Sequence, residues 1–308
     1  MRAAIISDYN APVAVTNIQK PVLPDDSVMV EVHAASVNPV DNYLRAGYLK
    51  GMLMLKFPYI LGYDVAGVVT EVGKDVTKFA IGDAVFARAN GMQAGTFAEF
   101  AAIKEVDLAK KPNNINFEEA ASLPLVSLTA WQALVQRAHM KAGDKVLIHA
   151  GSGGVGSIGI QIAKSFGAYV ASTTSTRNVG MVKSLGADLV IDYKTHKFDD
   201  LIKDYDIVLD TLGGETRMRS FPLLKKGGWL VSIVGDADKS GIAETLGVHQ
   251  DAFFMTPDGE QLAKIASLFE QGKITPLIDR TYSLDQIQEA LDYVQTGRAK
   301  GKIVIKIK

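Results

Sequence analysis

Three glycines, Gly151, Gly153 and Gly156, stand at the spacing G-x-G-x-x-G within the stretch HAGSGGVGSIG. This spacing suits a tight turn in which bare backbone N–H groups approach a pyrophosphate and a following helix favours the anion. The pattern is weak alone, because most glycine-rich turns are only turns. The cofactor-binding residues predicted in this turn are Gly151, Ser152, Gly153, Gly154, Val155 and Gly156.

A polar stretch about 20 residues after the turn bears on which dinucleotide binds, since NAD sites usually carry an Asp or Glu there for the ribose 2′-OH. After the glycine turn, the first carboxylate of this chain is that of Asp188. Hydroxyl groups and a guanidinium can donate to a 2′-phosphate, which a carboxylate would repel. We therefore predict NADP(H), the alternative being a polar helix cap with a solvated arginine. The predicted residues are Ser172, Thr173, Thr174, Ser175 and Arg177.

The glycine pattern indicates a dinucleotide-binding turn only if a strand precedes it and a helix follows it. KVLIH is typical of a strand, and VGSIGIQIAKSFG is typical of a helix. Further apolar strand patterns (AYVAST, DLVIDY, DIVLDT and WLVSIVG) follow, with helical or polar segments between them. Such alternation predicts a parallel sheet covered on both faces, which is the doubly wound α/β class.

The flanking segments have other patterns. Up to about residue 120, short β-rich runs between Pro, Gly and Asp turns predict a small barrel-like domain. A helical pattern begins at Phe117 and contains Pro124, which should break or restart the helix. After Pro257, two helices and a terminal strand do not continue the alternation, so we expect them to return to the first domain. The predicted domains are 1–122, 123–257 and 258–308.

Composition excludes several classes of function. The 308 residues include 33 Lys and Arg against 34 Asp and Glu, so no net field favours nucleic acid or an anionic membrane. The absence of cysteine removes disulfides, thiolate nucleophiles and thiolate-bound metals. We find no secretory pattern at the N-terminus and no run near the roughly 20 apolar residues of a membrane span. The expectation is a soluble, cytoplasmic protein with a small-molecule partner, without nucleic acid or membrane.

Seven segments in order carry a family resemblance: AASVNPVDNYLRAGY, LGYDVAGVVTEVG, FAIGDAVFA, AASLPLVSLTAWQAL, VLIHAGSGGVGSIGIQIAK, LGADLVIDY and GRAKGKIVIKI. The chain resembles the zinc-independent quinone oxidoreductases of the medium-chain dehydrogenase/reductase superfamily, which include zeta-crystallin-like proteins and alkenal/enone reductases. The resemblance implies a GroES-like, β-rich catalytic domain built from both chain ends and a Rossmann domain between them. It also implies a homodimer and a cleft where NADPH meets an electron-poor substrate.

The resemblance raises the question of zinc. In zinc-dependent relatives the segment matching LGYDVAG begins Gly-His-Glu, and cysteines supply further ligands. This chain has Tyr63 and Asp64 at those positions, no cysteine, and five scattered histidines. We therefore predict no metal site.

The resemblance also places an Asn and two Tyr residues of the active site in VNPVDNYLRAGY. The matching positions are Asn38, Tyr43 and, one residue out of register, Tyr48. Asn38 and Tyr43 would donate to the substrate oxygen or order a water that delivers the proton. For Tyr43 the alternative is pocket lining without proton transfer, and Asp41 is expected to be a loop hydrogen-bond acceptor.

The remaining candidates follow from the resemblance and from strand ends. The resemblance places Thr129 near the nicotinamide and Tyr193 near the adenosine phosphate. Gly213, Val234 and Gly235 come at the ends of strand patterns, at the carboxyl edge of the sheet, where ligands bind in such folds. The backbone at Val234 and Gly235 would bind the nicotinamide carboxamide. For each of them an ordinary core, cap or turn residue is the alternative.

The expected function is NADPH-dependent, zinc-independent hydride transfer to quinones or α,β-unsaturated carbonyl compounds. A conjugated acceptor spreads the developing charge to its oxygen, so hydrogen-bond donors suffice without a metal. The alternatives are an enoyl-thioester reductase, another zinc-free carbonyl reductase, or a non-catalytic, NADPH-binding zeta-crystallin-like protein.

Overall fold

The computed structural model describes residues 1–90 and 95–308, which form two compact units. Unit 1 comprises Met1–Leu125, Thr256–Glu270 and Pro276–Lys308, and unit 2 comprises Val126–Met255 and Gln271–Thr275. The short return to unit 2 is fixed by hydrogen bonds, because the Thr275 N–H donates to Oε1 of Gln161 at 2.8 Å. Nothing in the sequence pattern indicates this return.

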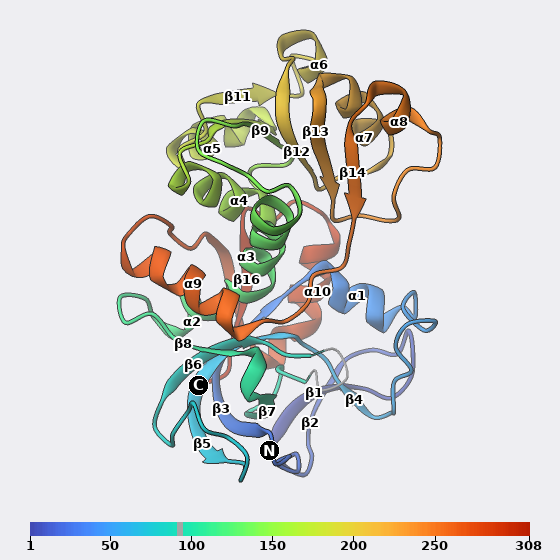
Figure 1. Ribbon diagram of the computed structural model, residues 1–308. Coiled ribbons are helices and arrows are strands. Elements are labelled where there is room, and N and C mark those ends of the chain that lie inside the picture. The colour runs from blue at the N-terminus through green and yellow to red at the C-terminus, as the bar shows by residue number, and fades with distance from the viewer. Residues whose placement is uncertain (91–94) are drawn as a thin grey trace. The chain divides into compact units, whose positions relative to one another are not determined.

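Unit 1 is rich in β-structure (Figure 1). A three-stranded sheet has the order β2-β1-β4, from β1 (Arg2–Ile6), β2 (Ala14–Asn17) and β4 (Tyr59–Ile60). Within the described ranges, a seven-stranded sheet runs β15-β16-β3-β5-β6-β8, with β7 also paired to β3. Its strands are β3 (Ser27–Val37), β5 (Asp64–Val72), β6 (Ala84–Arg88), β7 (Phe100–Lys104), β8 (Leu108–Lys110), β15 (Ile278–Ser283) and β16 (Lys302–Lys306).

The helices of unit 1 cover these sheets. They are α1 (Pro39–Arg45), α2 (Phe117–Ala121), α9 (Gly259–Glu270) and α10 (Ile287–Gln295). Apolar side chains of α10, including Ile287 and Leu291, share one buried cluster with Val37 of β3 and Ile303 of β16. Burial of this apolar face, rather than local helix propensity, fixes α10.

The register of β3 decides what lies beside its end. In the antiparallel pairing, Ser36 of β3 stands opposite Asp64 of β5, and Val37 stands opposite Ile303 of β16. The first residue of β16, Lys302, and the first residue of β5, Asp64, are therefore brought to the point where the chain leaves β3 for α1.

Unit 2 contains a parallel six-stranded sheet in the order β11-β10-β9-β12-β13-β14. Numbered within this unit, that is the order 3-2-1-4-5-6 of dinucleotide-binding folds, with the switch point between β9 and β12. The strands are β9 (Lys145–Ile148), β10 (Tyr169–Thr174), β11 (Leu189–Asp192), β12 (Tyr205–Asp210), β13 (Leu224–Ser232) and β14 (His249–Ala252).

Helices lie on both faces of this sheet (Figure 1). Leu147 and Val208 share a buried cluster with Phe198 and Phe221 on one face, while Leu209 and Ile148 approach Gly159 of α4 on the other. The predicted doubly covered α/β fold is thus confirmed. The helices are α3 (Pro124–Trp131), which begins in unit 1 and continues as a π-helical turn (Gln132–Arg137), α4 (Gly154–Ser165), α5 (Val179–Ser184), α6 (Phe198–Leu201), α7 (Gly214–Ser220) and α8 (Ile242–Leu246).

The predicted helix break is also present, since α2 ends at Ala121 and α3 begins at Pro124. Proline suits the first turn of a helix, because its missing N–H would have no intrahelical partner there. In the part of the chain that the structure describes, no helix is long and apolar enough to span a bilayer.

Candidate functional site

The glycine turn joins β9, which ends at Ile148, to α4, which begins at Gly154. A Cβ on Gly151 would lie 2.1 Å from Oγ of Ser172, and one on Gly156 would lie 2.3 Å from the Ala150 carbonyl oxygen. The fold therefore needs both glycines. A Cβ on Gly153 would have only the Ala150 oxygen nearby, at 3.4 Å, so the turn is open there. An open glycine at a helix N-terminus beside the switch point fits a bound pyrophosphate.

Two of the predicted phosphate-binding hydroxyls hold the turn instead. Ser172 is fully buried, and its Oγ donates to the Ile148 carbonyl at 2.7 Å. Thr173 is also buried, and its Oγ1 accepts from the Ala150 N–H at 3.2 Å and contacts Nδ1 of His149 at 3.1 Å. These partners correct the expectation that both hydroxyls face a 2′-phosphate, because each is used within the sheet and turn.

The end of β10 presents a smaller set of donors than predicted. Thr174 is buried, and its Oγ1 has no hydrogen-bond partner among the described residues. Ser175 is partly exposed, and its Oγ accepts from Nδ2 of Asn178 at 3.3 Å. Arg177 is exposed in the short helical turn Thr176–Asn178. Of the residues predicted to bind the 2′-phosphate at the end of β10, Arg177 and Ser175 are thus the ones open to solvent.

Sequence reasoning missed Asn178, which links the end of β10 to the glycine turn. Its buried side chain donates from Nδ2 to Oγ of Ser152 at 3.1 Å. Just after the neighbouring strand β11, Tyr193 is half-exposed and its N–H donates to the Thr174 carbonyl at 3.1 Å. Nζ of Lys194 lies 5.2 Å from the centre of the Tyr193 ring, which adds a second cation at this edge.

His149 is a structural residue of the turn. Oγ of Ser220 donates to the Thr216 carbonyl at 2.7 Å, so it accepts from Nε2 of His149 at 2.8 Å. Nδ1 then accepts from the Thr173 hydroxyl. Burial lowers the pKa of His149 to about 4, so the ring is neutral at physiological pH.

The carboxyl ends of β12 and β13 carry the predicted nicotinamide side of the site. Gly213 and Gly235 both adopt positive φ, at 69° and 67°, which glycine does at little cost. The Val234 N–H donates to Oγ of Ser232 at 3.2 Å, and its carbonyl accepts from Arg217. Both backbone groups of Val234 thus have partners within the loop, and binding of the carboxamide by the backbone at Val234 and Gly235 stays a prediction. Thr129 is buried on α3 within unit 2.

In unit 1, Asn38 lies in a buried polar cluster rather than at an open surface. Its Nδ2 donates to Oδ2 of Asp64 at 2.8 Å, and its Oδ1 accepts from Nζ of Lys302. Its backbone N–H donates to Oδ2 of Asp41 at 2.7 Å, as expected of Asp41 as a loop acceptor. Because the amide is buried and engaged, Asn38 positions the start of α1, and the prediction of a substrate donor is corrected.

The charges of this cluster compensate one another. Nζ of Lys302 lies 3.4 Å from Oδ2 of Asp64, which also accepts from Oγ of Ser36 at 2.8 Å. Burial lowers the pKa of Lys302, although Asp64 opposes that shift. Burial also raises the pKa of Asp41 well above its ordinary value. Asp64 and Lys302 were not predicted as a pair, since 238 positions separate them.

Tyr43 and Tyr48 are the exposed members of the predicted catalytic set. Their side chains are 51% and 78% exposed, and their ring centres lie 6.2 Å apart. Both line a cavity of about 460 Å³ in unit 1, together with Asn42 and Arg45. Their phenol groups are therefore open to a small ligand, to which a phenol O–H can donate a hydrogen bond.

The residues at the zinc-ligand positions do not suit zinc. Tyr63 is buried with the Arg88 guanidinium 4.5 Å from its ring centre, and Asp64 is engaged with Lys302, Asn38 and Ser36. The sequence has no cysteine to complete a site. Over residues 1–90 and 95–308, no three His, Cys, Asp or Glu side chains form a group that could hold a metal ion.

Comparison with known proteins agrees with this architecture. The family profile described as "Alcohol dehydrogenase GroES-like domain" matches residues 24–113, and that described as "Zinc-binding dehydrogenase" matches residues 185–305. The chain belongs to the medium-chain dehydrogenase/reductase family. The predicted GroES-like and Rossmann-type parts are therefore confirmed.

Three relatives are named as reductases or oxidoreductases. The 2-methylene-furan-3-one reductase of Solanum lycopersicum is 39% identical, over 99% of this chain and 79% of its own. The NADPH-dependent alkenal/one oxidoreductase, chloroplastic, of Arabidopsis thaliana is 37% identical, with the same coverages. The solved quinone oxidoreductase from Coxiella burnetii is 33% identical, with a TM-score of 0.90 over 100% of this chain and 99% of its own. The family is thus one of oxidoreductases, and its named relatives include quinone and enone reductases.

Proposed function

We propose that this chain is an NADPH-dependent reductase that transfers hydride to quinones or α,β-unsaturated carbonyl compounds without a catalytic zinc ion. The choice of NADPH rests on Arg177. This residue is exposed in the turn that follows β10, in the region where an NAD site has a carboxylate. A guanidinium attracts a 2′-phosphate and can bind it with two hydrogen bonds. The name of the Arabidopsis relative, which includes NADPH, supports the same choice.

The acceptor class follows from the donors that the chain offers. Bound NADPH supplies a hydride from C4 of its nicotinamide. In a quinone or enone the resulting negative charge is delocalised to oxygen, so neutral hydrogen-bond donors can stabilise it. The names of the tomato and Coxiella relatives, an enone reductase and a quinone oxidoreductase, support this class.

Each residue has a distinct proposed role. The backbone from Gly151 to Gly156 binds the pyrophosphate, and Arg177 binds the 2′-phosphate. The Tyr43 hydroxyl, on the exposed side of α1, donates to the substrate oxygen or orders the water that delivers the proton. Asn38 acts on the reaction through the buried cluster that sets the start of α1.

The experiment is a substrate panel of quinones, alkenals, enones and enoyl thioesters, followed by loss of nicotinamide absorbance with NADPH and NADH. We expect turnover of quinones or enones with a preference for NADPH, unchanged after dialysis against a chelator. Faster turnover of enoyl thioesters would favour that alternative, and NADPH binding without any oxidation would favour a non-catalytic protein. Tyr43→Phe retains the ring, so unchanged turnover would assign Tyr43 to pocket lining.

Two further parts of the proposal come from the sequence. We propose that the protein is a homodimer, as the family resemblance implies, and that it works in the cytoplasm on a small-molecule substrate, as the absence of cysteine favours. Light scattering of the purified protein measures the mass of the assembly, and a mass near the 33.1 kDa of one chain would contradict the dimer.

A further inference from the structure

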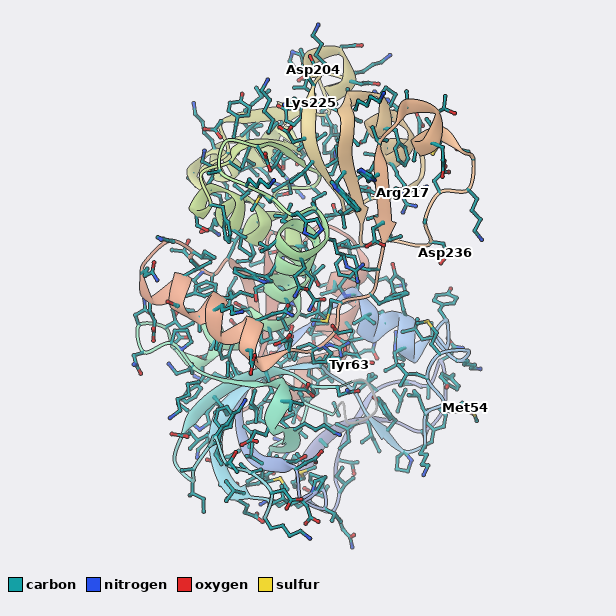
Figure 2. The ribbon with its side chains drawn as sticks, in the orientation of Figure 1. Met54, Tyr63, Asp204, Arg217, Lys225 and Asp236 are labelled. Atoms are coloured by element: carbon teal, nitrogen blue, oxygen red, sulfur yellow. The ribbon has the colours of Figure 1, made fainter. Side chains whose placement is uncertain are left out.

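The guanidinium of Arg217, on α7, donates hydrogen bonds to four groups. It is buried, and its Nε donates to Oδ2 of Asp210 at 2.8 Å. Nη1 donates to the Asp236 carbonyl at 2.6 Å, and Nη2 donates to Oγ of Ser232 at 2.7 Å and to the Val234 carbonyl. Arg217 and Asp236 can be followed in Figure 2. One guanidinium thus connects the end of β12 with the loop after β13.

Asp210 completes the connection on the β12 side. Its Oδ1 accepts from the N–H groups of Leu212 and Gly213, at 3.0 and 2.8 Å. Burial alone would raise its pKa, but the Gly213 N–H and the Arg217 guanidinium hold that pKa below the ordinary value. Asp210 is therefore ionised at neutral pH, and its buried ion pair with Arg217 is present at that pH.

The two loops joined in this way need such support. Gly213 and Gly235 have positive φ, a conformation that glycine also leaves easily. Both loops lie at the carboxyl edge of the sheet, on the β12 and β13 side of the switch point, whereas Ser152 and Arg177 follow β9 and β10 on the other side. Ligand-binding folds of this kind use the two sides for different halves of a dinucleotide.

We propose that Arg217 is a positioning residue that holds the loops at Leu212–Gly213 and Val234–Asp236 in the shape that receives the nicotinamide half of the cofactor. This inference rests on the proposed NADPH site. Arg217 then supports binding of the nicotinamide half of the cofactor and not binding of the adenosine half. An arginine that only stabilised the fold would weaken the binding of both halves or of neither.

The experiment compares two ligands by calorimetry, using full-length protein. NADPH carries both halves, whereas adenosine 2′,5′-bisphosphate carries the adenosine and 2′-phosphate without nicotinamide. Arg217→Lys retains a cation opposite Asp210 but loses the fork that reaches Ser232, Val234 and Asp236 together. We expect the affinity of this variant for NADPH to fall about tenfold or more, because hydrogen bonds to a charged group are lost. Its affinity for adenosine 2′,5′-bisphosphate should equal that of the wild-type protein.

Matched variants keep the test decisive. Arg219→Lys changes a second arginine of α7, partly exposed and paired with Asp199 at 2.8 Å, and should leave both affinities unchanged. Ser232→Ala removes one partner of Arg217 and should give a smaller loss for NADPH alone. Equal losses for both ligands, or an unchanged affinity for NADPH, would overturn the positioning role. If the unchanged protein binds neither ligand, the proposed function itself fails, and this inference fails with it.

Discussion

Nζ of Lys302 lies 3.4 Å from Oδ2 of Asp64, and both side chains are almost completely buried. The pair joins the first residue of β16 to the first residue of β5, and Asn38 bridges the two charges with its amide. A buried ion pair need not stabilise a fold relative to apolar residues, but removal of one partner leaves an uncompensated buried charge. The start of α1, and with it Tyr43, therefore depends on this pair.

The first prediction concerns Lys302→Met. Loss of the ammonium leaves Asp64 and the Asn38 carbonyl oxygen without a cation in a buried site, so the free energy of unfolding should fall by about 3–5 kcal/mol. Urea denaturation measures this change. Lys306→Met, on the same strand but exposed, is the control and should change the free energy by less than about 1 kcal/mol. Equal small effects of both variants would show that the cluster does not set the stability of unit 1.

The second prediction separates two glycines of the turn. Gly156→Ala forces a Cβ to within 2.3 Å of the Ala150 carbonyl oxygen, so it should lower both thermal stability and cofactor affinity. Gly153→Ala meets only an atom at 3.4 Å, so the melting temperature should remain close to that of the unchanged protein. Its methyl group would nevertheless stand where a pyrophosphate approaches, and NADPH binding should weaken. If Gly153→Ala binds NADPH normally, the turn does not hold the pyrophosphate in the proposed way.

The third prediction tests the choice of cofactor. Arg177→Ala should raise the KM for NADPH by about 10–100-fold, because a hydrogen-bonded contact with a charged group is lost, and should change the KM for NADH by less than about twofold. Steady-state kinetics with both cofactors gives the comparison. Lys183→Ala, an exposed cation on the following helix, is the matched control. Equal losses for the two cofactors would remove Arg177 from recognition of the 2′-phosphate.

The fourth prediction concerns pH. The folded-state pKa of His149 is lowered from 6.5 to about 4, so the stability contributed by the neutral ring is fully present above about pH 6.5 and is lost as the pH falls towards 4. The loss amounts to about 3 kcal/mol. His149→Gln keeps a donor and an acceptor but does not titrate in this range. Denaturation at pH 7.5 and pH 4.5 should therefore show a smaller acid loss in this variant, and equal losses would contradict the assignment.

The sequence predicts the fold of unit 2 well because its signals are local. The strand KVLIH, the glycines and the following helix lie within about 20 residues, and each element has its own hydrophobic period. The break at Pro124 is local in the same sense. In the short return of Gln271–Thr275 to unit 2, Thr275 is hydrogen-bonded to the distant Gln161, and no local pattern indicates that contact.

The site was less predictable, because its contacts join distant residues. Asn38 has the right type and position for a substrate donor, but its amide is occupied by Asp64 and by Lys302, 264 positions away. Ser172 lies in a stretch of hydroxyls that looks suited to a phosphate, yet it is buried and its Oγ donates to the Ile148 carbonyl at the end of the distant strand β9. Exposure, not residue type, distinguishes Arg177 and Tyr43 from these buried neighbours.

The most direct test of the proposed function follows the hydride itself. NADPH deuterated at C4 on the transferred face is incubated with the protein and an α,β-unsaturated ketone, and the product is examined by NMR. The account predicts a saturated ketone that carries deuterium at the β-carbon. An allylic alcohol with deuterium at the former carbonyl carbon would contradict it, as would unlabelled, unreacted ketones and quinones in the presence of bound NADPH.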